Sequence, residues 1–318
     1  MAGDRVRRPG EASEAGRGAS AGLGDGIGGG LRSGFAAVVG RPNVGKSTLT
    51  NALVGEKIAI TSSKPETTRH RVRGIIDGER HQVVLVDTPG LHRPRTLLGE
   101  RLNAAVREAL ADVDVAVVCL PADQAIGPGD RFLLAALPPG LSKVAAVTKA
   151  DAAPRAALAA KLVEVDRLAD WRAVVPVSAI GGDGGPGVGE LAAVLAGAMP
   201  AGPRWYPRGE ATDEPLEVRI AELVREAVLE MVRDELPHSV AALVDEIDLP
   251  RIRVWLFVER DSQKGIVIGR RGAGLKAVGS RARPQIEALV GRKVFLEIQV
   301  KVAKEWQRDP KALNRLGF

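Results

Sequence analysis

The segment Gly40-Arg-Pro-Asn-Val-Gly-Lys-Ser47 limits the possible folds of this chain more than any other stretch. It has the spacing G-x-x-x-x-G-K-S, follows the apolar run 35–39 and precedes the helical pattern 49–54. Glycines let successive backbone N–H groups turn toward one anion, and a helix that follows adds the positive end of its dipole. A buried strand, this loop and a helix in that order predict a phosphate-binding loop in an α/β domain.

Each residue of the loop is a candidate contact to a nucleoside triphosphate. Lys46 is expected to reach the β- and γ-phosphates and to act in catalysis, and the Ser47 hydroxyl is expected to ligate Mg²⁺. The other candidates in the loop are Gly40, Arg41, Pro42, Asn43, Val44 and Gly45.

A second element follows the apolar run 83–86 and consists of Asp87, Thr88, Pro89 and Gly90. Alone, an Asp that closes a strand is most often a turn residue. Together with the loop at 40–47, Asp87 is placed to hold the Mg²⁺ shell and the Gly90 N–H to touch the γ-phosphate. We therefore expect all four residues to bind nucleotide and Gly90 to act in catalysis.

The polar stretch Glu66-Thr-Thr-Arg-His-Arg71 lies between these two elements. A loop that senses the γ-phosphate supplies a hydroxyl to the Mg²⁺ ion. We assign that hydroxyl, and a catalytic role, to Thr68, with Thr67 as the alternative.

Base selection is predicted from Thr148-Lys149-Ala-Asp151, at the exit of the apolar run 143–147. A carboxylate at Asp151 accepts hydrogen bonds from N1–H and N2–H₂ of guanine, and adenine has no such donor pair. Thr148, Lys149 and Asp151 are therefore candidate guanine contacts. Ser178 and Ala179 follow another apolar run and are candidates for a backbone contact to guanine O6.

The order of apolar segments predicts the fold class. Strand-like and helix-like patterns alternate between residues 34 and 200, which is typical of a mostly parallel sheet with helices on both faces. We expect strands at 35–39, 83–86, 113–120, 143–147 and 173–177, and helices at 97–110, 131–137, 155–168 and 188–199.

Composition sets the domain boundaries. Residues 1–33 hold 10 Gly without apolar periodicity, so we expect a disordered tail. Pro and Gly cluster at 200–209, which indicates a break. We therefore predict a nucleotide-binding domain at 34–200, a linker at 201–215 and a second domain at 216–318.

The second domain is predicted to be α+β, in the order helix, strand, strand, helix, helix, strand. Its first helix is expected at 216–236, and Pro284 is expected to kink or stop its last helix near Arg283. Residues 260–318 carry 14 Lys and Arg against 5 Asp and Glu, which favours a polyanionic partner. A solvated basic face without a ligand remains the alternative.

Gly269-Arg270-Arg271-Gly272 has the G-x-x-G spacing of the loop that clamps the nucleic-acid backbone in KH domains. With 37 Gly in the chain, about four such matches arise by chance, so the spacing alone decides nothing. The apolar run 266–268 before it and the flanking strand patterns support a KH domain that resembles the bacterial variety, here called type II. The candidate RNA-binding residues are Lys264, Gly269, Arg270, Arg271, Gly272, Lys276, Arg281 and Lys293.

These motifs together resemble the Era family of GTPases, and the resemblance covers nearly everything after residue 33. It is carried by GRPNVGKS at 40–47, ETTRHR at 66–71, DTPGL at 87–91, TKAD at 148–151, SA at 178–179, VERDSQKGIVIGRRGAGLK at 258–276 and VKVAKEWQRDPKALNRLGF at 300–318. Two positions depart from the family pattern: Thr148 replaces an Asn, which is expected to remove a contact to base and loop, and Ile180 replaces a polar residue. Nucleotide affinity is expected to suffer, while Asp151 preserves guanine selectivity.

The resemblance implies a switch that hydrolyses GTP to GDP, binds the 3′ region of 16S rRNA and assists assembly of the small (30S) ribosomal subunit. It also implies contact with the inner face of the cell membrane. We expect the protein to be cytoplasmic, because the sequence has no apolar stretch of about 18 residues and no signal core. We also expect a monomer.

The glutamine that orients water in many GTPases is Leu91 here, which predicts slow intrinsic hydrolysis. By resemblance to GTPases with a hydrophobic residue at that place, Asn43 is a candidate K⁺ ligand and a catalytic residue. The alternative for Asn43 is a loop residue that tolerates an unusual backbone angle.

Two other functions stay open at this point. One is an RNA assembly scaffold that binds nucleotide without turnover, favoured by Leu91 and Thr148. The other is a metabolic kinase, for which the sequence shows no acceptor lid. Cys119 lies in an apolar run and the four His residues lack metal-ligand spacing, so thiol and zinc chemistry are not expected.

Overall fold

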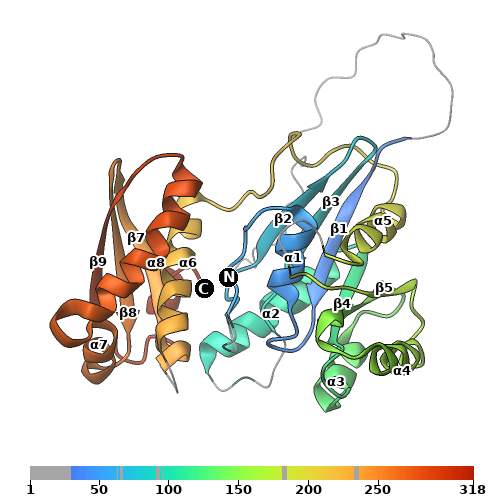
Figure 1. Cartoon of the computed structure of the whole chain (residues 1–318), viewed down its shortest axis with the longest axis horizontal. Coiled ribbons are helices and arrows are strands. Elements are labelled where there is room, and N and C mark those ends of the chain that lie inside the picture. Colours follow the sequence, from blue (N-terminus) through green and yellow to red (C-terminus); the bar gives the residue numbers. More distant parts are fainter. Residues whose placement is uncertain are drawn as a thin grey trace, which may run out of the picture.

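The computed structural model describes residues 30–318, apart from 63, 65–66, 91–93, 95, 181–184 and 233–235. The described residues form a larger unit built on a six-stranded sheet and a smaller unit built on a three-stranded sheet (Figure 1). Among these residues, no helix combines the length and the apolar character needed to cross a membrane.

The larger sheet has the strand order β2-β3-β1-β4-β5-β6. Its strands are β1 (Arg32–Val39), β2 (Val72–Asp77), β3 (His81–Asp87), β4 (Val115–Pro121), β5 (Ser142–Thr148) and β6 (Ala173–Pro176). All neighbouring pairs are parallel except β2 and β3, which are antiparallel. The predicted mostly parallel sheet is confirmed, and its phosphate-binding loop follows the central strand β1.

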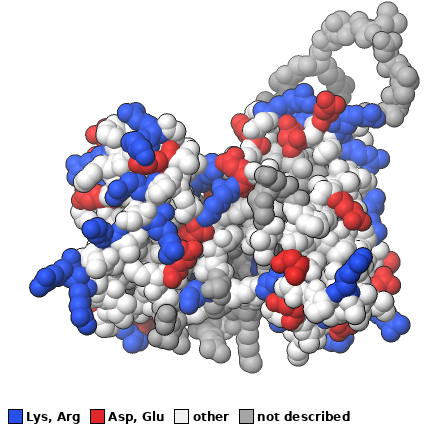
Figure 2. Space-filling view, in the orientation of Figure 1, with Lys and Arg blue, Asp and Glu red and all other residues white. Residues whose placement is uncertain are grey.

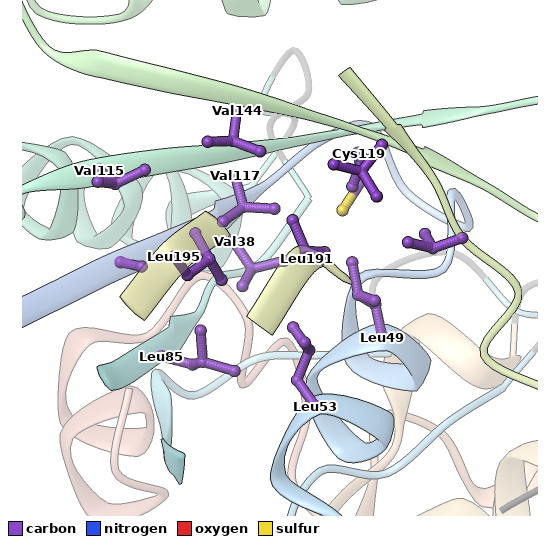
Figure 3. Packing of buried hydrophobic residues seen from close by; sticks show 14 of the residues in the cluster. Val38, Leu49, Leu53, Leu85, Val115, Val117, Cys119, Val144, Leu191 and Leu195 are labelled. Atoms are coloured by element: carbon purple, nitrogen blue, oxygen red, sulfur yellow. The ribbon is translucent and has the colours of Figure 1, made fainter. Parts of the chain in front are cut away.

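Helices cover both faces of this sheet. They are α1 (Lys46–Val54), α2 (Leu97–Ala111), α3 (Pro128–Ala136), α4 (Arg155–Asp166) and α5 (Val188–Ala198). On one face, Leu49 of α1 and Leu191 of α5 pack over Val38 and Val117 (Figure 3). The other face buries α2, α3 and α4. Burial on both faces explains why the strands read as continuous Ala and Val runs.

Two features of this sheet differ from expectation. The strand β1 begins at Arg32, three residues before the expected start, because Arg32 Nη1 lies 2.8 Å from the Met199 carbonyl oxygen and the Ser33 N–H bonds to Pro200. Residues 32–33 therefore do not belong to a disordered tail, and residues 1–29 lie outside the described part of the chain. The antiparallel edge strand β2 was not expected, since its residues combine apolar and charged side chains.

The linker 201–215 lies along β2 and is held there by specific bonds. The Ile75 N–H donates to the Ala211 carbonyl, and the Thr212 hydroxyl donates to the Arg73 carbonyl at 2.6 Å. The fully buried Gln82 side chain of β3 accepts from the N–H groups of Trp205 and Tyr206. Much of the exposed edge of β2 is thereby covered.

The smaller unit pairs β7 antiparallel and β9 parallel to the central strand β8. Its elements are α6 (Leu216–Met231), β7 (Ala241–Asp248), β8 (Arg251–Val258), α7 (Asp261–Ile268), α8 (Ala273–Val290), β9 (Phe295–Val302) and α9 (Pro310–Arg315). The helices α6, α7 and α8 pack on one sheet face through an aliphatic core. The predicted α+β order is confirmed, with the added helix α9.

Pro284 does not stop α8. The helix continues to Val290, so the expected early end near Arg283 is wrong. A proline removes one hydrogen bond to the carbonyl four residues earlier, here that of Ser280. Both Ser280 and Pro284 are exposed, so water reaches that carbonyl, and the buried Ile286 holds the continuing helix on the core.

The two units meet along α6 and along the segment after β9. Figure 1 shows α6 on the side of the smaller unit that faces the larger one. The side chains Leu98 and Leu102 of α2 pack with Phe257, Trp306 and other buried residues of the smaller unit. Trp306 is fully buried and donates from Nε1 to the Ser239 carbonyl, so it packs the segment after β9 against the rest of the smaller unit.

Candidate functional site

The phosphate-binding loop joins β1 to the N-terminus of α1. Gly45 precedes the helix with φ 96°, a left-handed conformation that favours glycine. The first turn of α1 contains no acidic side chain of its own, and its positive end faces the loop. Asn43 has φ 64°, which agrees with its alternative role as a loop residue with an unusual backbone angle.

Lys46 lies inside this loop. Its Nζ donates to the carbonyl oxygens of Gly40 at 3.2 Å and Arg41 at 2.9 Å. Burial lowers the pKa of the Lys46 ammonium, against the opposing effect of Asp87. Phosphate oxygens would favour the charged form, so the residue is suited to bind an anion.

Three oxygen-bearing side chains converge beside the loop. Ser47 Oγ lies 2.8 Å from Thr68 Oγ1 and 2.7 Å from Asp87 Oδ2. Burial raises the pKa of Asp87 to about 6, and its buried Oδ1 has no hydrogen-bond partner among the described residues. A buried carboxylate with an orphaned oxygen and two hydroxyls is the donor set of a hard divalent cation, so these residues fit Mg²⁺.

The segment after β3 packs against the loop. The buried Thr88 hydroxyl donates to the Val38 carbonyl at 2.8 Å. A Cβ on Gly90 would lie 2.8 Å from the backbone nitrogen of Pro42, so only glycine fits there. Pro89, which lies between Thr88 and Gly90 in the sequence, is buried as well. The predicted Leu91 lies outside the described residues, and its role in hydrolysis stays a prediction.

A cavity of about 50 Å³ joins the loop to the stretch around Thr68 and to Gly90. It is adjacent to a second cavity of about 200 Å³, which shares Gly45 and Thr48. The second cavity is lined by Gly45, Thr48, Thr148, Lys149, Asp151, Ala152, Val177, Ala179 and Ile180. The predicted phosphate and base positions thus line two neighbouring cavities that share Gly45 and Thr48.

The base cavity is formed where β5 and β6 end. Lys149 has φ 54°, and its Nζ lies 3.6 Å from Asp123. Asp151 is exposed toward solvent beside it, as a residue that meets a ligand must be. The backbone N–H of Ser178 bonds to Pro186, so Ser178 shapes the loop that presents Ala179.

The expected loss of a loop contact at Thr148 is wrong. The Thr148 hydroxyl donates to the Val44 carbonyl at 2.6 Å, and both residues are buried. A short hydroxyl therefore ties the base-binding strand end to the phosphate-binding loop. Ile180, at the other departure from the family pattern, is 71% exposed on the rim of the base cavity.

Sequence reasoning missed the partner of Arg41. Its Nε lies 2.7 Å from Oδ1 of Asp130, which is 1% exposed and accepts the Gly127 N–H through Oδ2. Gly129 leaves room for the Arg41 stem, since a Cβ there would lie 2.8 Å from Arg41 Cδ. An Asp three residues after a Gly, with Pro between them, is a helix-start signal that could have located this carboxylate.

Sequence reasoning also missed how the smaller unit contacts the segment that carries Thr68. The 3% exposed Arg69 side chain donates to the carbonyls of His238 at 2.7 Å and Val240 at 2.6 Å, and lies 5.6 Å from the Trp306 ring centroid. Burial lowers the pKa of the neighbouring His70, whose ring stacks on Phe318 at 4.7 Å. The segment after Thr68 is therefore part of the contact between the two units.

The G-x-x-G loop connects α7 to α8. Gly269, Arg271 and Gly272 have φ values of 72°, 50° and 80°, so the chain turns sharply and leaves Arg270 and Arg271 exposed. Lys and Arg side chains project from the end of the smaller unit where α7 lies (Figures 1 and 2).

The other predicted basic residues lie on or near the same helices. Lys264 is on α7, and Lys276 and Arg281 are on α8. Arg281 pairs with Glu230 at 2.7 Å and Lys293 pairs with Glu287 at 2.8 Å. Both ion pairs are solvent-exposed, and such pairs are weak enough for a phosphate to replace the carboxylate.

The described residues contain no cluster of three His, Cys, Asp or Glu side chains that could hold a metal ion. Cys119 is fully buried under the phosphate-binding loop, and burial raises the pKa of its thiol to about 12.

Family models match both units. A model described as a 50S ribosome-binding GTPase matches residues 35–149, and a KH domain model matches residues 235–307. Proteins called GTPase Era from Mycolicibacterium paratuberculosis and Mycobacterium tuberculosis are 58% identical to this chain, over 91% of its length and 99% of theirs.

Two solved structures are similar over 90% of this chain and 99% of their own, each at 32% identity. One is a variant of Aquifex aeolicus Era bound to GDP and AlF₄⁻, with a TM-score of 0.85. The other is Era in complex with MgGDPNP and nucleotides 1506–1542 of 16S ribosomal RNA, with a TM-score of 0.86.

Proposed function

Because this chain belongs to the GTPase Era family, it is a GTPase, and we propose that its nucleotide state controls how its KH domain holds ribosomal RNA. The observation that carries the proposal is the position of Arg69. This residue adjoins Thr68, the candidate sensor of the bound ion, and its guanidinium bonds to the KH-domain carbonyls of His238 and Val240. A change around the γ-phosphate can therefore reach the KH domain through Arg69.

We assign GTP binding to the loop Gly40–Ser47, to Asp87–Gly90 and to the base cavity around Asp151. The Ser47 and Thr68 hydroxyls and the Asp87 carboxylate would hold Mg²⁺, which offsets negative charge on the phosphates when bound. Lys46 would bind the β- and γ-phosphates, and the Gly90 N–H would touch the γ-phosphate. Water is oriented by groups other than a glutamine, so intrinsic hydrolysis is expected to be slow.

Asn43 remains our candidate K⁺ ligand. Its left-handed backbone lies at the rim of the phosphate cavity, which it helps to line. A monovalent cation there would stabilise charge between the β- and γ-phosphates. Hydrolysis assays with K⁺ replaced by Na⁺ test this role, and equal rates in the two salts would remove it.

The KH domain is proposed to bind the 3′ region of 16S rRNA within an assembling 30S subunit. Support comes from the RNA carried by the similar solved structure and from the exposed arginines of the G-x-x-G loop. The description of the matched GTPase model names the 50S subunit. We favour the 30S subunit because the RNA-bearing relative matches over 99% of its chain.

A second route of coupling runs through α2, the helix that follows the Asp87–Gly90 element. Leu98 and Leu102 lie in one apolar cluster with Trp306, and the Leu98 N–H donates to the Gln307 carbonyl at 3.0 Å. Apolar cores respond to displacement by repacking rather than by gradual deformation. Movement of α2 would therefore alter the segment after β9.

The decisive experiment measures binding of the full chain to a 16S 3′-end oligonucleotide, with GDP or with a non-hydrolysable GTP analogue. We expect affinities that differ by about 5- to 150-fold, the usual range of coupling between two sites. Arg69→Gln should reduce this difference, whereas Arg167→Gln, on the exposed surface of the GTPase domain, should not. Equal RNA affinities in the two nucleotide states would mean that the nucleotide does not control RNA binding. That result would favour the alternative function, an RNA assembly scaffold.

We further propose that the protein is a monomer of the cytoplasm that also contacts the inner face of the membrane. The exposed cations near the G-x-x-G loop support attraction to an anionic surface. Sedimentation with vesicles of phosphatidylglycerol and phosphatidylcholine tests the contact. Failure to sediment at low salt would exclude it.

A further inference from the structure

Helix α6 of the KH domain presents two adjacent charged side chains to the GTPase domain. Arg225 is 1% exposed and Glu226 is 3% exposed. Charged groups are seldom this buried, because leaving water costs several kcal/mol unless partners compensate. Both side chains form bonds with the segment that leads to Thr68 or with residues close to that segment.

Arg225 binds the backbone next to Thr68. Its Nη2 donates to the Thr67 carbonyl oxygen, and its Nε lies 2.7 Å from Glu222 Oε1 while Nη2 lies 2.6 Å from Glu222 Oε2. The fork of two bonds to Glu222 fixes the guanidinium plane. The Thr67 carbonyl is therefore held by a rigid donor that belongs to the other domain.

Glu226 binds the beginning of the same segment. Its Oε1 accepts the Thr61 N–H at 2.8 Å, and its Oε2 pairs with Lys57 Nζ at 2.5 Å. Thr61 and Thr67 both line the small cavity beside Ser47 and Gly90. Two neighbouring residues of α6 thus hold both ends of the stretch that shapes the γ-phosphate side of the site.

We propose that Arg225 and Glu226 are positioning residues for GTP hydrolysis. By holding Thr67 and Thr61, they keep the Thr68 hydroxyl beside Ser47, so the KH domain supplies part of the catalytic geometry of the GTPase domain. They act through the backbone of two described residues, the Thr61 N–H and the Thr67 carbonyl. This inference rests on the proposed function.

The main experiment measures single-turnover hydrolysis and nucleotide affinity of full-length Arg225→Gln, without RNA. We expect hydrolysis about 5- to 20-fold slower, as for loss of one or two charge-assisted hydrogen bonds. GDP affinity should be unchanged, because GDP lacks the γ-phosphate that the Thr68 segment senses. Preference for a non-hydrolysable GTP analogue over GDP should fall, and half-maximal rate should require more Mg²⁺.

Arg219→Gln is the matched control. Arg219 also lies on α6 and also bonds to the GTPase domain, through Glu56 at 2.7 Å and the Lys57 carbonyl, but it forms no bond to the described residues of the Thr61–Thr68 segment. We expect a wild-type hydrolysis rate. An equal loss in Arg219→Gln and Arg225→Gln would mean that the domain contact is merely loosened, and would overturn the proposal.

Glu226 gives an independent test that does not depend on the folding of the Arg225 variant. Glu226→Gln keeps an oxygen acceptor for the Thr61 N–H and should hydrolyse GTP normally, whereas Glu226→Ala removes it and should be slow. Wild-type rates in both Arg225→Gln and Glu226→Ala would refute the positioning role. That result would leave the proposed function standing, since nucleotide-dependent RNA binding by the wild-type chain is measured separately.

Discussion

The Thr148 hydroxyl donates a hydrogen bond of 2.6 Å to the carbonyl oxygen of Val44. This bond joins the end of β5, which bears the base-recognition motif, to the phosphate-binding loop. In the usual motif this position is an Asn, whose side-chain amide is expected to contact the loop. Here the Thr148 hydroxyl makes that contact instead. The two halves of the nucleotide site are therefore held in register even though the motif departs from its usual form.

Thr148→Val should weaken binding of both GDP and GTP by about tenfold, because it leaves the buried Val44 carbonyl without its donor at a cost of about 1–3 kcal/mol. Thr148→Ser keeps the hydroxyl and should bind nearly as well as wild type. Fluorescent-nucleotide titration gives both affinities. Equal nucleotide affinities of the Val and Ser variants would show that the hydrogen bond does not contribute to nucleotide binding.

Asp151→Asn should change the base preference of the protein from guanine to xanthine. The carboxylate accepts from two guanine donors, whereas an amide offers a donor that the 2-oxo group of xanthine accepts. Competition of GDP and XDP for the full chain measures the change. Unaltered preference for GDP in the variant would argue that Asp151 does not contact the base.

Asp130→Asn should lower the free energy of unfolding by about 1–2 kcal/mol, because the charge-assisted bond between Arg41 Nε and a buried carboxylate is replaced by a neutral one. GDP affinity should fall as well, since Arg41 belongs to the phosphate-binding loop. Arg131→Gln, on the exposed surface of α3, is the control. Urea unfolding with and without GDP separates the two effects.

The G-x-x-G loop is expected to act through charge. Replacement of Arg270 and Arg271 together by Gln should weaken RNA binding and reduce the slope of log affinity against log salt by about 1–2, as for loss of one or two phosphate contacts. Arg167→Gln should leave the slope unchanged. A salt titration in which the double variant keeps the wild-type slope would place the RNA elsewhere.

Glu214 predicts a pH dependence of stability. Burial, together with the nearby Asp213, raises the pKa of the Glu214 carboxyl to about 7, from an ordinary value of 4.5. The folded state thus favours the protonated form of Glu214, so the contribution of this group to stability is fully present below pH 4.5 and is lost as pH rises through 7. Glu214→Gln should raise the melting temperature at pH 8 by about 3 °C and change little at pH 5.

Much of the nucleotide site was predictable because its residues occupy fixed spacings at strand ends. Ser47, Thr68 and Asp87 were chosen from three separate segments, and the structure brings their oxygens within 2.8 Å. The parallel sheet explains why Ser47 and Asp87 meet, since the carboxyl ends of β1 and β3 lie at one edge. The roles of these residues in binding nucleotide and Mg²⁺ stay predictions. The bond from Thr148 to Val44 was not predictable, because the length of a side chain does not reveal which carbonyl it reaches.

The contacts between domains escaped prediction for a related reason. Arg69, Arg225 and Glu226 look like ordinary solvated charges in the sequence, and only the arrangement of two separately folded units buries them. The edge strand β2 was missed because its six residues mix apolar side chains with Arg73 and Gly74 and lack a regular alternation. Pro284 misled the estimate of helix length, since tertiary packing outweighed the loss of one backbone hydrogen bond.

The bonds that fasten the linker to β2 restrict how the two domains can move. Thr212 and Asp213 are anchored to Arg73, and α6 begins at Leu216. Only Glu214 and Pro215 lie between anchor and helix, a span of about 7 Å when extended. Relative motion of the domains is therefore a swing about a pivot two residues long, and the RNA-holding half cannot drift away from the nucleotide half on a long tether.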